Sequence, residues 1–153
     1  MDTAKLLQIK VKDVMTTKVM TVRENDVMSK VENLMIQHNF NHIPIVDDRD
    51  NLVGILTKND IQLLKDWGTN LKLRTSLKAN EQLLNSHTAD DRMNRKLVMV
   101  GPDDTLKMCA DIFSKNLFHA LPVTEGTKLV GIITTYDLLN VAYARTPLHT
   151  LNK

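Results

Sequence analysis

The chain of 153 residues has little of several things that common protein functions require. Its single cysteine, Cys109, excludes an intramolecular disulfide and a thiolate metal cluster. Cys109 lies in an apolar-periodic stretch, so we interpret it as a buried thiol rather than a reactive one. The net charge of +2 is too small to draw nucleic acid or an anionic membrane from a distance. Aromatic residues make up only 4% of the chain, too few for a base-stacking platform. We expect no nucleic-acid partner.

Long hydrophobic runs and catalytic motifs are missing too. The apolar run at residues 6–9 is far shorter than a signal sequence or a membrane helix, so we expect a cytoplasmic protein without a membrane partner. No Gly-x-x-x-x-Gly-Lys loop is present, and no Ser or Cys nucleophile has an obvious supporting His. His38 and His42 lack a third metal ligand nearby, and the eight methionines suit core packing better than copper binding. We therefore expect neither an enzyme nor a metal site.

The chain does contain an internal sequence repeat. A shift of 78 residues superimposes Met15 on Met93, Lys18 on Lys96, Val22 on Val100, Asp26 on Asp104, Phe40 on Phe118 and Pro44 on Pro122. After a one-residue deletion in the turn at 47–51, the shift becomes 77, and Leu-Val-Gly-Ile at 52–55 falls on the same four residues at 129–132. Thr57 then matches Thr134 and Asp60 matches Asp137. These matches indicate a duplication.

Hydrophobic periodicity gives each copy the order strand, helix, strand, strand, helix. In the first copy we expect a strand at 19–22, a helix that Asn25 or Asp26 caps, a hairpin at 42–46 and 52–57, and a helix at 59–65. Its first helix should bury Val27, Val31, Leu34, Met35 and His38. The second copy repeats this with a strand at 97–100, a helix starting at 103–104, a hairpin at 120–124 and 129–134, and a helix at 135–143. Its first helix should bury Leu106, Cys109, Ala110, Phe113 and Leu117.

The expected domain organisation follows from the two copies. It comprises an N-terminal segment 1–10, a first repeat 11–65, a linker 66–88 with room for a short helix, a second repeat 89–143 and a C-terminal tail 144–153. Trp67 opens the linker, and its ring is interpreted either as core packing or as a subunit contact. One repeat of this size is marginal alone, so we expect an α+β fold of two pseudo-symmetric repeats packed sheet against sheet, with paired clefts between them.

A Thr-x-x-Asp motif closes the hairpin of each copy, as Thr57 with Asp60 and as Thr134 with Asp137. Each motif lies where a strand gives way to a helix, beside unpaired backbone N–H groups. A carboxylate there suits the diol of a ribose, and a Thr hydroxyl suits ribose or phosphate oxygens. The same spacing is also a variant of the capping box, in which the two side chains only stabilise the helix start. Both interpretations stay open.

The duplicated pattern, with His-Ile-Pro-Ile-Val and Ala-Leu-Pro-Val-Thr ahead of each Gly-x-x-Thr-x-x-Asp, resembles the CBS domain family. A tandem pair of these repeats is called a Bateman module, and the likeness runs from about residue 11 to about residue 143. It implies a regulatory module whose clefts bind AMP, ADP, ATP, S-adenosylmethionine or a cyclic dinucleotide as regulatory ligand, with no required cofactor. It also implies a homodimer and leaves room for a regulated protein partner.

The resemblance also assigns site residues to two clefts. In one, Thr57 and Asp60 hold the ribose and phosphate end, Val98 after Lys96 offers its backbone to the adenine, and Phe118 and His119 border the ring. In the other, the corresponding residues are Thr134 and Asp137, Met20 near Lys18, and Phe40 with Asn41.

The two clefts differ in charge. Family members often carry a basic residue two before the hairpin proline, where this chain has His42 in one copy and Ala120 in the other. His42, with Lys58 beside it, is thus a candidate phosphate partner. Lys18 and Lys96 are either substitutes for it or solvated lysines at strand ends. The competing hypothesis, which Ala120 favours, is a protein-interaction or dimerisation module with vestigial clefts.

Overall fold

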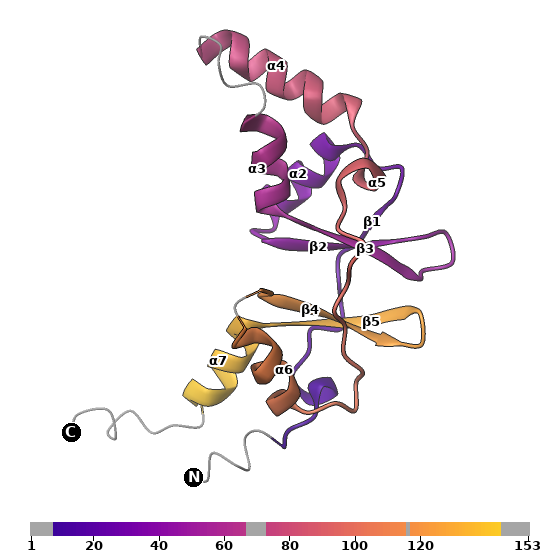
Figure 1. Cartoon of the computed structure of the whole chain (residues 1–153), viewed down its shortest axis with the longest axis vertical. Coiled ribbons are helices and arrows are strands. Elements are labelled where there is room, and N and C mark those ends of the chain that lie inside the picture. The colour runs from indigo at the N-terminus through magenta and orange to yellow at the C-terminus, as the bar shows by residue number, and fades with distance from the viewer. Residues whose placement is uncertain (1–7, 67–72, 116, 145–153) are drawn as a thin grey trace, which may run out of the picture. The chain divides into compact units, whose positions relative to one another are not determined.

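The computed structural model describes residues 8–66, 73–115 and 117–144, and shows two compact units (Figure 1). The first-repeat unit is Met20–Leu97. The second-repeat unit combines Met1–Val19 with Val98–Lys153. Both units mix helices and strands, which confirms the α+β class. None of the helices in the described ranges has the length and apolar character needed to cross a membrane.

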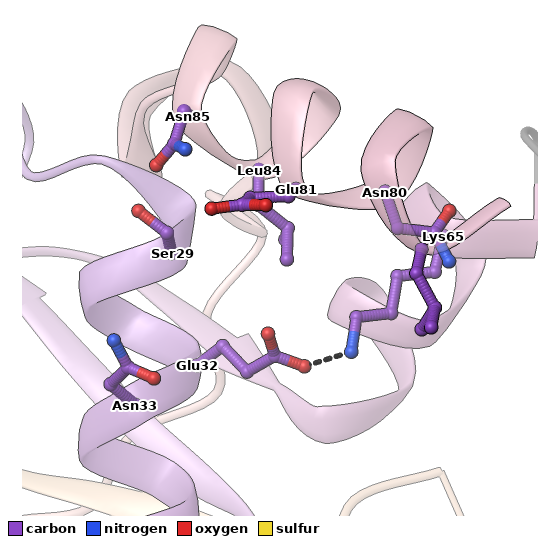
Figure 2. Close-up of a pocket in the computed structure, with 9 residues that line it drawn as sticks. Ser29, Glu32, Asn33, Lys65, Asn80, Glu81, Leu84 and Asn85 are labelled. Carbon is purple, nitrogen blue, oxygen red and sulfur yellow. Dashed lines mark hydrogen bonds and ion pairs between the residues drawn. The ribbon is translucent and has the colours of Figure 1, made fainter. Parts of the chain in front are cut away.

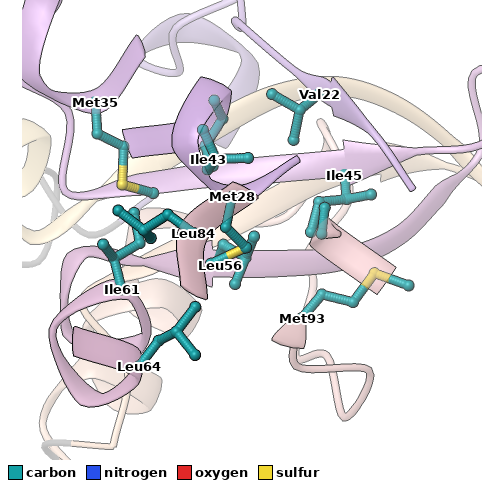
Figure 3. Packing of buried hydrophobic residues seen from close by; sticks show 12 residues of the cluster. Val22, Met28, Met35, Ile43, Ile45, Leu56, Ile61, Leu64, Leu84 and Met93 are labelled. Atoms are coloured by element: carbon teal, nitrogen blue, oxygen red, sulfur yellow. The ribbon is translucent and has the colours of Figure 1, made fainter. Parts of the chain in front are cut away.

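The first-repeat unit is built on a three-stranded sheet in the order β1-β2-β3. β1 (Val22–Arg23) runs parallel to β2 (His42–Val46), which forms an antiparallel hairpin with β3 (Leu52–Thr57). Its helices are α2 (Met28–Gln37), α3 (Lys58–Asp66), α4 (Leu73–Ser86) and α5 (Ala89–Arg92). The core includes Met28, Met35, Ile43, Leu56 and Leu64, all at most 2% exposed (Figure 3).

The second-repeat unit repeats the plan with fewer elements. It contains the 3-10 turn η1 (Val11–Asp13), α6 (Leu106–Phe113), the hairpin of β4 (Ala120–Glu125) and β5 (Lys128–Thr134), and α7 (Thr135–Ala144). Its core gathers Val11, Cys109, Leu121, Val123 and Ile133. Burial raises the pKa of the Cys109 thiol to about 11, which agrees with a packing role.

The entry segment of each copy packs on the hairpin of the other copy. Thr16 forms a two-way backbone bridge with Ile132 of β5, at 2.9 and 3.0 Å. Asn94 does the same with Ile55 of β3, at 2.9 and 3.1 Å. The duplicated methionines explain the duplicated glycines, because a Cβ at Gly54 would lie 2.2 Å from Met93 Sδ and one at Gly131 would lie 2.4 Å from Met15 Sδ. Both glycines are therefore needed for close approach.

Both hairpins and their following helices agree with the sequence prediction, whereas the strands ahead of the first helices are shorter than predicted. Pairing covers only Val22–Arg23 in the first copy and a single parallel bridge from Val100 to Val123 in the second. The predicted strands at 19–22 and 97–100 are thus wrong over most of their length. Only their last residues, Val22 and Val100, enter a core and pair with a neighbouring strand.

The first helices also begin later than predicted. Val27, not Asn25 or Asp26, is the N-cap of α2, because its backbone is bridged to Thr88. Val27 and His38, both expected in the core, are exposed, and Met28 is buried instead. Thr105 caps α6, where its side chain accepts a bond from the Met108 amide. Leu117, expected in the buried stripe, lies beyond the end of α6 and is 73% exposed.

The linker between the copies forms more structure than its sequence suggested. α4 spans 14 residues and packs against α2 and α3. Its Leu84 enters the first core with 4% exposure, and Leu83 packs beside it. The part of the linker at 67–72, including Trp67, lies outside the described residues, as does the tail from 145.

Candidate functional site

Thr57 and Asp60 meet at the junction of β3 and α3. Asp60 Oδ2 accepts hydrogen bonds from the Thr57 amide and from Thr57 Oγ1, both at 2.7 Å. The Asp60 amide in turn donates to Thr57 Oγ1 at 3.3 Å. This reciprocal pattern is the capping box that the sequence allowed. No bond to Asp60 Oδ1 is formed within the described ranges, so one carboxylate oxygen stays available at the helix start.

The second copy reproduces this geometry. Asp137 Oδ2 accepts from the amide and the hydroxyl of Thr134 at 2.7 Å, and the Asp137 amide donates to Thr134 Oγ1 at 3.3 Å. Both aspartates are half-buried. Capping is thus present in both copies, and it engages only one oxygen of each carboxylate. The same side chain has an acceptor left for a ligand.

A third box of this kind was not singled out from the sequence. Thr88 caps α5, and Asp91 Oδ2 accepts from the Thr88 amide at 2.8 Å and from Thr88 Oγ1 at 3.1 Å. These bonds lower the pKa of the Asp91 carboxyl below its usual value. The Thr-x-x-Asp spacing at 88–91 was the signal that could have revealed it. This box follows α4, whereas the two duplicated boxes follow a hairpin. It therefore shows the capping bonds without the hairpin that precedes Thr57 and Thr134.

The hairpins bring further candidate residues to the two duplicated boxes. His42 is the Cα partner of Thr57 across β2 and β3, and the Lys58 amide donates to the Asn41 carbonyl at 3.1 Å. Asn41, predicted for the cleft of Thr134 and Asp137, therefore lies with His42, Thr57, Lys58 and Asp60 at the helix start of its own copy.

The second-repeat unit places the matching residues in the same way. Ala120 is the partner of Thr134, and the Thr135 amide donates to the His119 carbonyl at 3.1 Å. His119, predicted to border the cleft of Thr57 and Asp60, thus lies beside Thr134 and Asp137 of its own copy. Ala120 is 5% exposed, so the position that corresponds to His42 holds a buried methyl group.

The remaining candidate residues belong to their own units. Met20 packs against the first core, whereas Val98 and Phe118 pack against the second. Phe40 stacks on His38 with ring centroids 5.4 Å apart, which leaves part of its ring exposed. The units that hold the two parts of each expected cleft are separate bodies, so the full set of contacts remains a prediction.

The candidate cations are solvated. Lys18, Lys58 and Lys96 are exposed, and none of their ammonium groups forms an ion pair within residues 8–66, 73–115 and 117–144. All three are thus free to meet an anionic ligand, although this exposure agrees equally with lysines that only solvate strand ends. In the same ranges, no three His, Cys, Asp or Glu side chains gather as metal ligands would.

Comparisons with known proteins place the chain in a family. The CBS domain model matches residues 11–64 and 89–144. The chain is 31% identical over 128 residues to the CBS domain-containing protein YhcV of Bacillus subtilis, and the match covers 84% of this chain and 81% of YhcV.

Two further likenesses bear on function. The chain is 30% identical over 129 residues to L-aspartate semialdehyde sulfurtransferase of Methanocaldococcus jannaschii, covering 84% of this chain but only 22% of that protein. A solved CBS domain pair of protein MJ0100, in complex with 5-methylthioadenosine and S-adenosyl-L-methionine, has 27% identity and a TM-score of 0.70. That match covers 90% of this chain and 98% of the solved one.

Proposed function

Because the chain belongs to the CBS domain family, we propose that it is a regulatory module that senses an adenine nucleotide or an adenosyl compound. The MJ0100 pair, which binds 5-methylthioadenosine and S-adenosyl-L-methionine, supports this ligand class. The module itself carries out no reaction in this proposal. Where a relative of the chain is an enzyme, the chain spans about a fifth of its length, as with the sulfurtransferase. The proposed ligands are metabolites of the cytoplasm, where we place the protein.

The observation that carries the proposal is the spare oxygen of each duplicated carboxylate. Asp60 and Asp137 use Oδ2 to cap a helix, and Oδ1 of each forms no hydrogen bond within the described ranges. A ribose diol presents two O–H donors, which a carboxylate oxygen accepts with charge-assisted hydrogen bonds. The Thr hydroxyl is held by the same aspartate and is therefore already oriented.

Each ligand would take its ribose contacts from one copy and its base contacts from the other. For the first site we propose Thr57 and Asp60, with the Val98 backbone and Phe118 and His119 around the adenine. For the second site we propose Thr134 and Asp137, with Met20, Phe40 and Asn41. Lys96 and Lys18, which precede Val98 and Met20 by two residues in the sequence, are proposed to border the respective base pockets. In this scheme the ligand bridges the copies and biases their relative angle by its differential affinity for the two arrangements.

Charge distinguishes the two proposed sites. His42 and Lys58 accompany Asp60, whereas buried Ala120 accompanies Asp137. A ligand with phosphates gains favourable charge interactions with His42 and Lys58 at the first site, and the second site lacks counterparts of both. We therefore propose that ATP and AMP occupy the Asp60 site and that uncharged or cationic adenosyl compounds suit the Asp137 site.

Isothermal titration calorimetry with ATP, AMP, S-adenosylmethionine and adenosine tests this proposal. We expect saturable binding of at least one adenosyl compound, and a preference for phosphates that weakens in His42→Ala. Absence of heat and of a thermal shift with all four compounds would overturn the proposal. Equal affinity of His42→Ala and the wild-type chain for ATP would remove only the assignment of phosphate to the first site.

A second candidate function is protein interaction, and the surface of α7 favours it. None of the described side chains of α7 is buried, and Tyr136, Leu139 and Tyr143 are 68%, 66% and 62% exposed. Their spacing places them along one helix face, a pattern typical of a helix that packs against a partner. A homodimer is the simplest partner. Sedimentation of Leu139→Glu beside the wild-type chain tests this, and an unchanged monomer in both would refute it.

A further inference from the structure

A cavity of about 380 Å³ lies in the first-repeat unit, where α4 packs against α2 and α3 (Figure 2). α2 contributes Ser29, Glu32 and Asn33, and α3 contributes Lys65. α4 supplies Asn80 and Glu81 together with the apolar Leu77 and Leu84. All of these residues belong to one compact unit, and none of them is a residue of the proposed nucleotide sites.

The charges around this cavity are unequal. Lys65 Nζ forms an ion pair with Glu32, which neutralises both groups. Glu81 has no ion-pair partner among the described residues and is exposed. The lining therefore carries one net negative charge. Figure 2 shows the Glu81 and Glu32 carboxylates on opposite sides of the open space, with Leu84 near Glu81.

The hydrogen-bonding capacity of the lining is also unbalanced. Asn80 Oδ1 is buried and has no hydrogen-bond partner among the described residues. A buried acceptor without a donor destabilises the folded state, and a ligand donor in the cavity can remove the penalty once the Asn80 amide rotates toward the open space. The unfilled requirement is thus for a donor, and the surplus charge is negative. Both features point to a cationic ligand that donates hydrogen bonds.

We propose that this cavity binds a small aliphatic amine, with its ammonium group between Glu81 and Asn80 and its carbon chain against Leu77 and Leu84. An anion is disfavoured because Lys65, the lysine of the lining, already forms an ion pair with Glu32. A metal ion is disfavoured because the lining offers only two carboxylates, one of them ion-paired, and no three His, Cys, Asp or Glu side chains gather in the described ranges. The cavity occurs in the first-repeat unit because α4 belongs to the linker between the two copies and is not part of the duplicated pattern.

An amine in this cavity would bridge α4 to α2 and α3. It would therefore favour the docked state of α4 through its differential affinity for docked and undocked forms. The proposal adds a second input to the module and does not depend on the proposed adenosyl sites. The two can fail separately, since Asp60→Ala should leave amine binding unchanged.

Calorimetry on the full chain with 1,4-diaminobutane tests the proposal, with 1,4-butanediol as the uncharged ligand of equal length. We expect saturable binding of the diamine that weakens with salt, and little binding of the diol. Glu81→Gln should weaken diamine binding by about fivefold, the size expected for an exposed ion pair. Lys65→Met should tighten it by about the same factor, because Glu32 then loses its partner.

The matched control is Glu125→Gln, which removes an exposed carboxylate from β4 of the other unit. It should leave diamine affinity unchanged. Opposite effects of Glu81→Gln and Lys65→Met cannot both arise from poor folding. No binding of the diamine, equal binding of the diol, or an equal loss in Glu125→Gln and Glu81→Gln would each overturn the proposal.

Discussion

Replacing Asp60 with Ala separates the capping and ligand-binding interpretations of the Thr-x-x-Asp motif. The substitution removes two bonds that Asp60 Oδ2 accepts from Thr57, both at 2.7 Å. Loss of a helix cap costs about 1 kcal/mol of unfolding free energy. Loss of a charge-assisted acceptor to a bound diol costs a further 1.5–3 kcal/mol, or about 10- to 150-fold in affinity. Only the second effect depends on ligand.

Asp91→Ala is the matched control, since Asp91 forms the same bonds to Thr88 at 2.8 and 3.1 Å outside the proposed sites. Urea unfolding measures the stability of each variant, and calorimetry measures its affinity for adenosyl ligands. Both variants should lose about 1 kcal/mol from a total of about 5–15 kcal/mol, so both stay almost fully folded. A fall in affinity confined to Asp60→Ala therefore cannot come from unfolding.

The reasoning would be refuted by a simple result. If Asp60→Ala and Asp91→Ala lose equal stability and bind adenosyl compounds as tightly as the wild-type chain, the carboxylate only caps a helix. Asp137→Ala extends the comparison to the second copy. An effect of Asp60→Ala with none of Asp137→Ala would indicate a single functional site.

Three further predictions concern packing and titration. Gly54→Ala should lower the unfolding free energy by about 1–3 kcal/mol in urea titrations, because its Cβ would lie 2.9 Å from Met93 Cβ. Cys109, with a pKa of about 11, should react with thiol reagents at pH 8 only as the chain unfolds, so labelling should accelerate with urea. Two lysines hold the pKa of Asp103 at about 2 instead of 3.8, so its contribution to stability is present above pH 3.8 and is lost as pH falls toward 2. Acid unfolding of Asp103→Asn at low salt should lack this component, and high salt should shrink it in the wild-type chain.

Local patterns predicted the hairpins and their following helices well, because residues that are near in sequence decide them. The apolar, β-branched runs at 42–46 and 52–57, on either side of an acidic turn, were sufficient to define β2 and β3. The strands ahead of the first helices were overestimated, since their pairing depends on a distant hairpin edge that reaches only Val22 and Val100. The exchange of Met15 and Met93 between copies is likewise a long-range choice. No periodicity within the entry segments encodes it.

The family and the two Thr-x-x-Asp boxes could be predicted from the sequence, and the family is confirmed. The sequence left capping and ligand binding as alternatives, and the structure shows the capping bonds at Oδ2, while ligand binding at Oδ1 stays a prediction. The amine-sized cavity could not be foreseen, because it depends on how α4 lies against α2 and α3. Periodicity predicts that a helix has a buried face, but it does not predict which polar side chains surround a gap beside that face.

The three capping boxes show where ligand specificity must reside. Thr88 with Asp91 has the same bonds as the other two boxes, so the motif alone does not make a binding site. What distinguishes Asp60 and Asp137 is the hairpin before them, which fixes the Asn41 and His119 carbonyls against the amide that follows each Thr. We therefore regard a helix start as a candidate ribose site only where the start of a neighbouring strand, β2 or β4, lies directly beside it. Differences between His42 and Ala120 at that strand start should therefore decide which ligand each copy accepts.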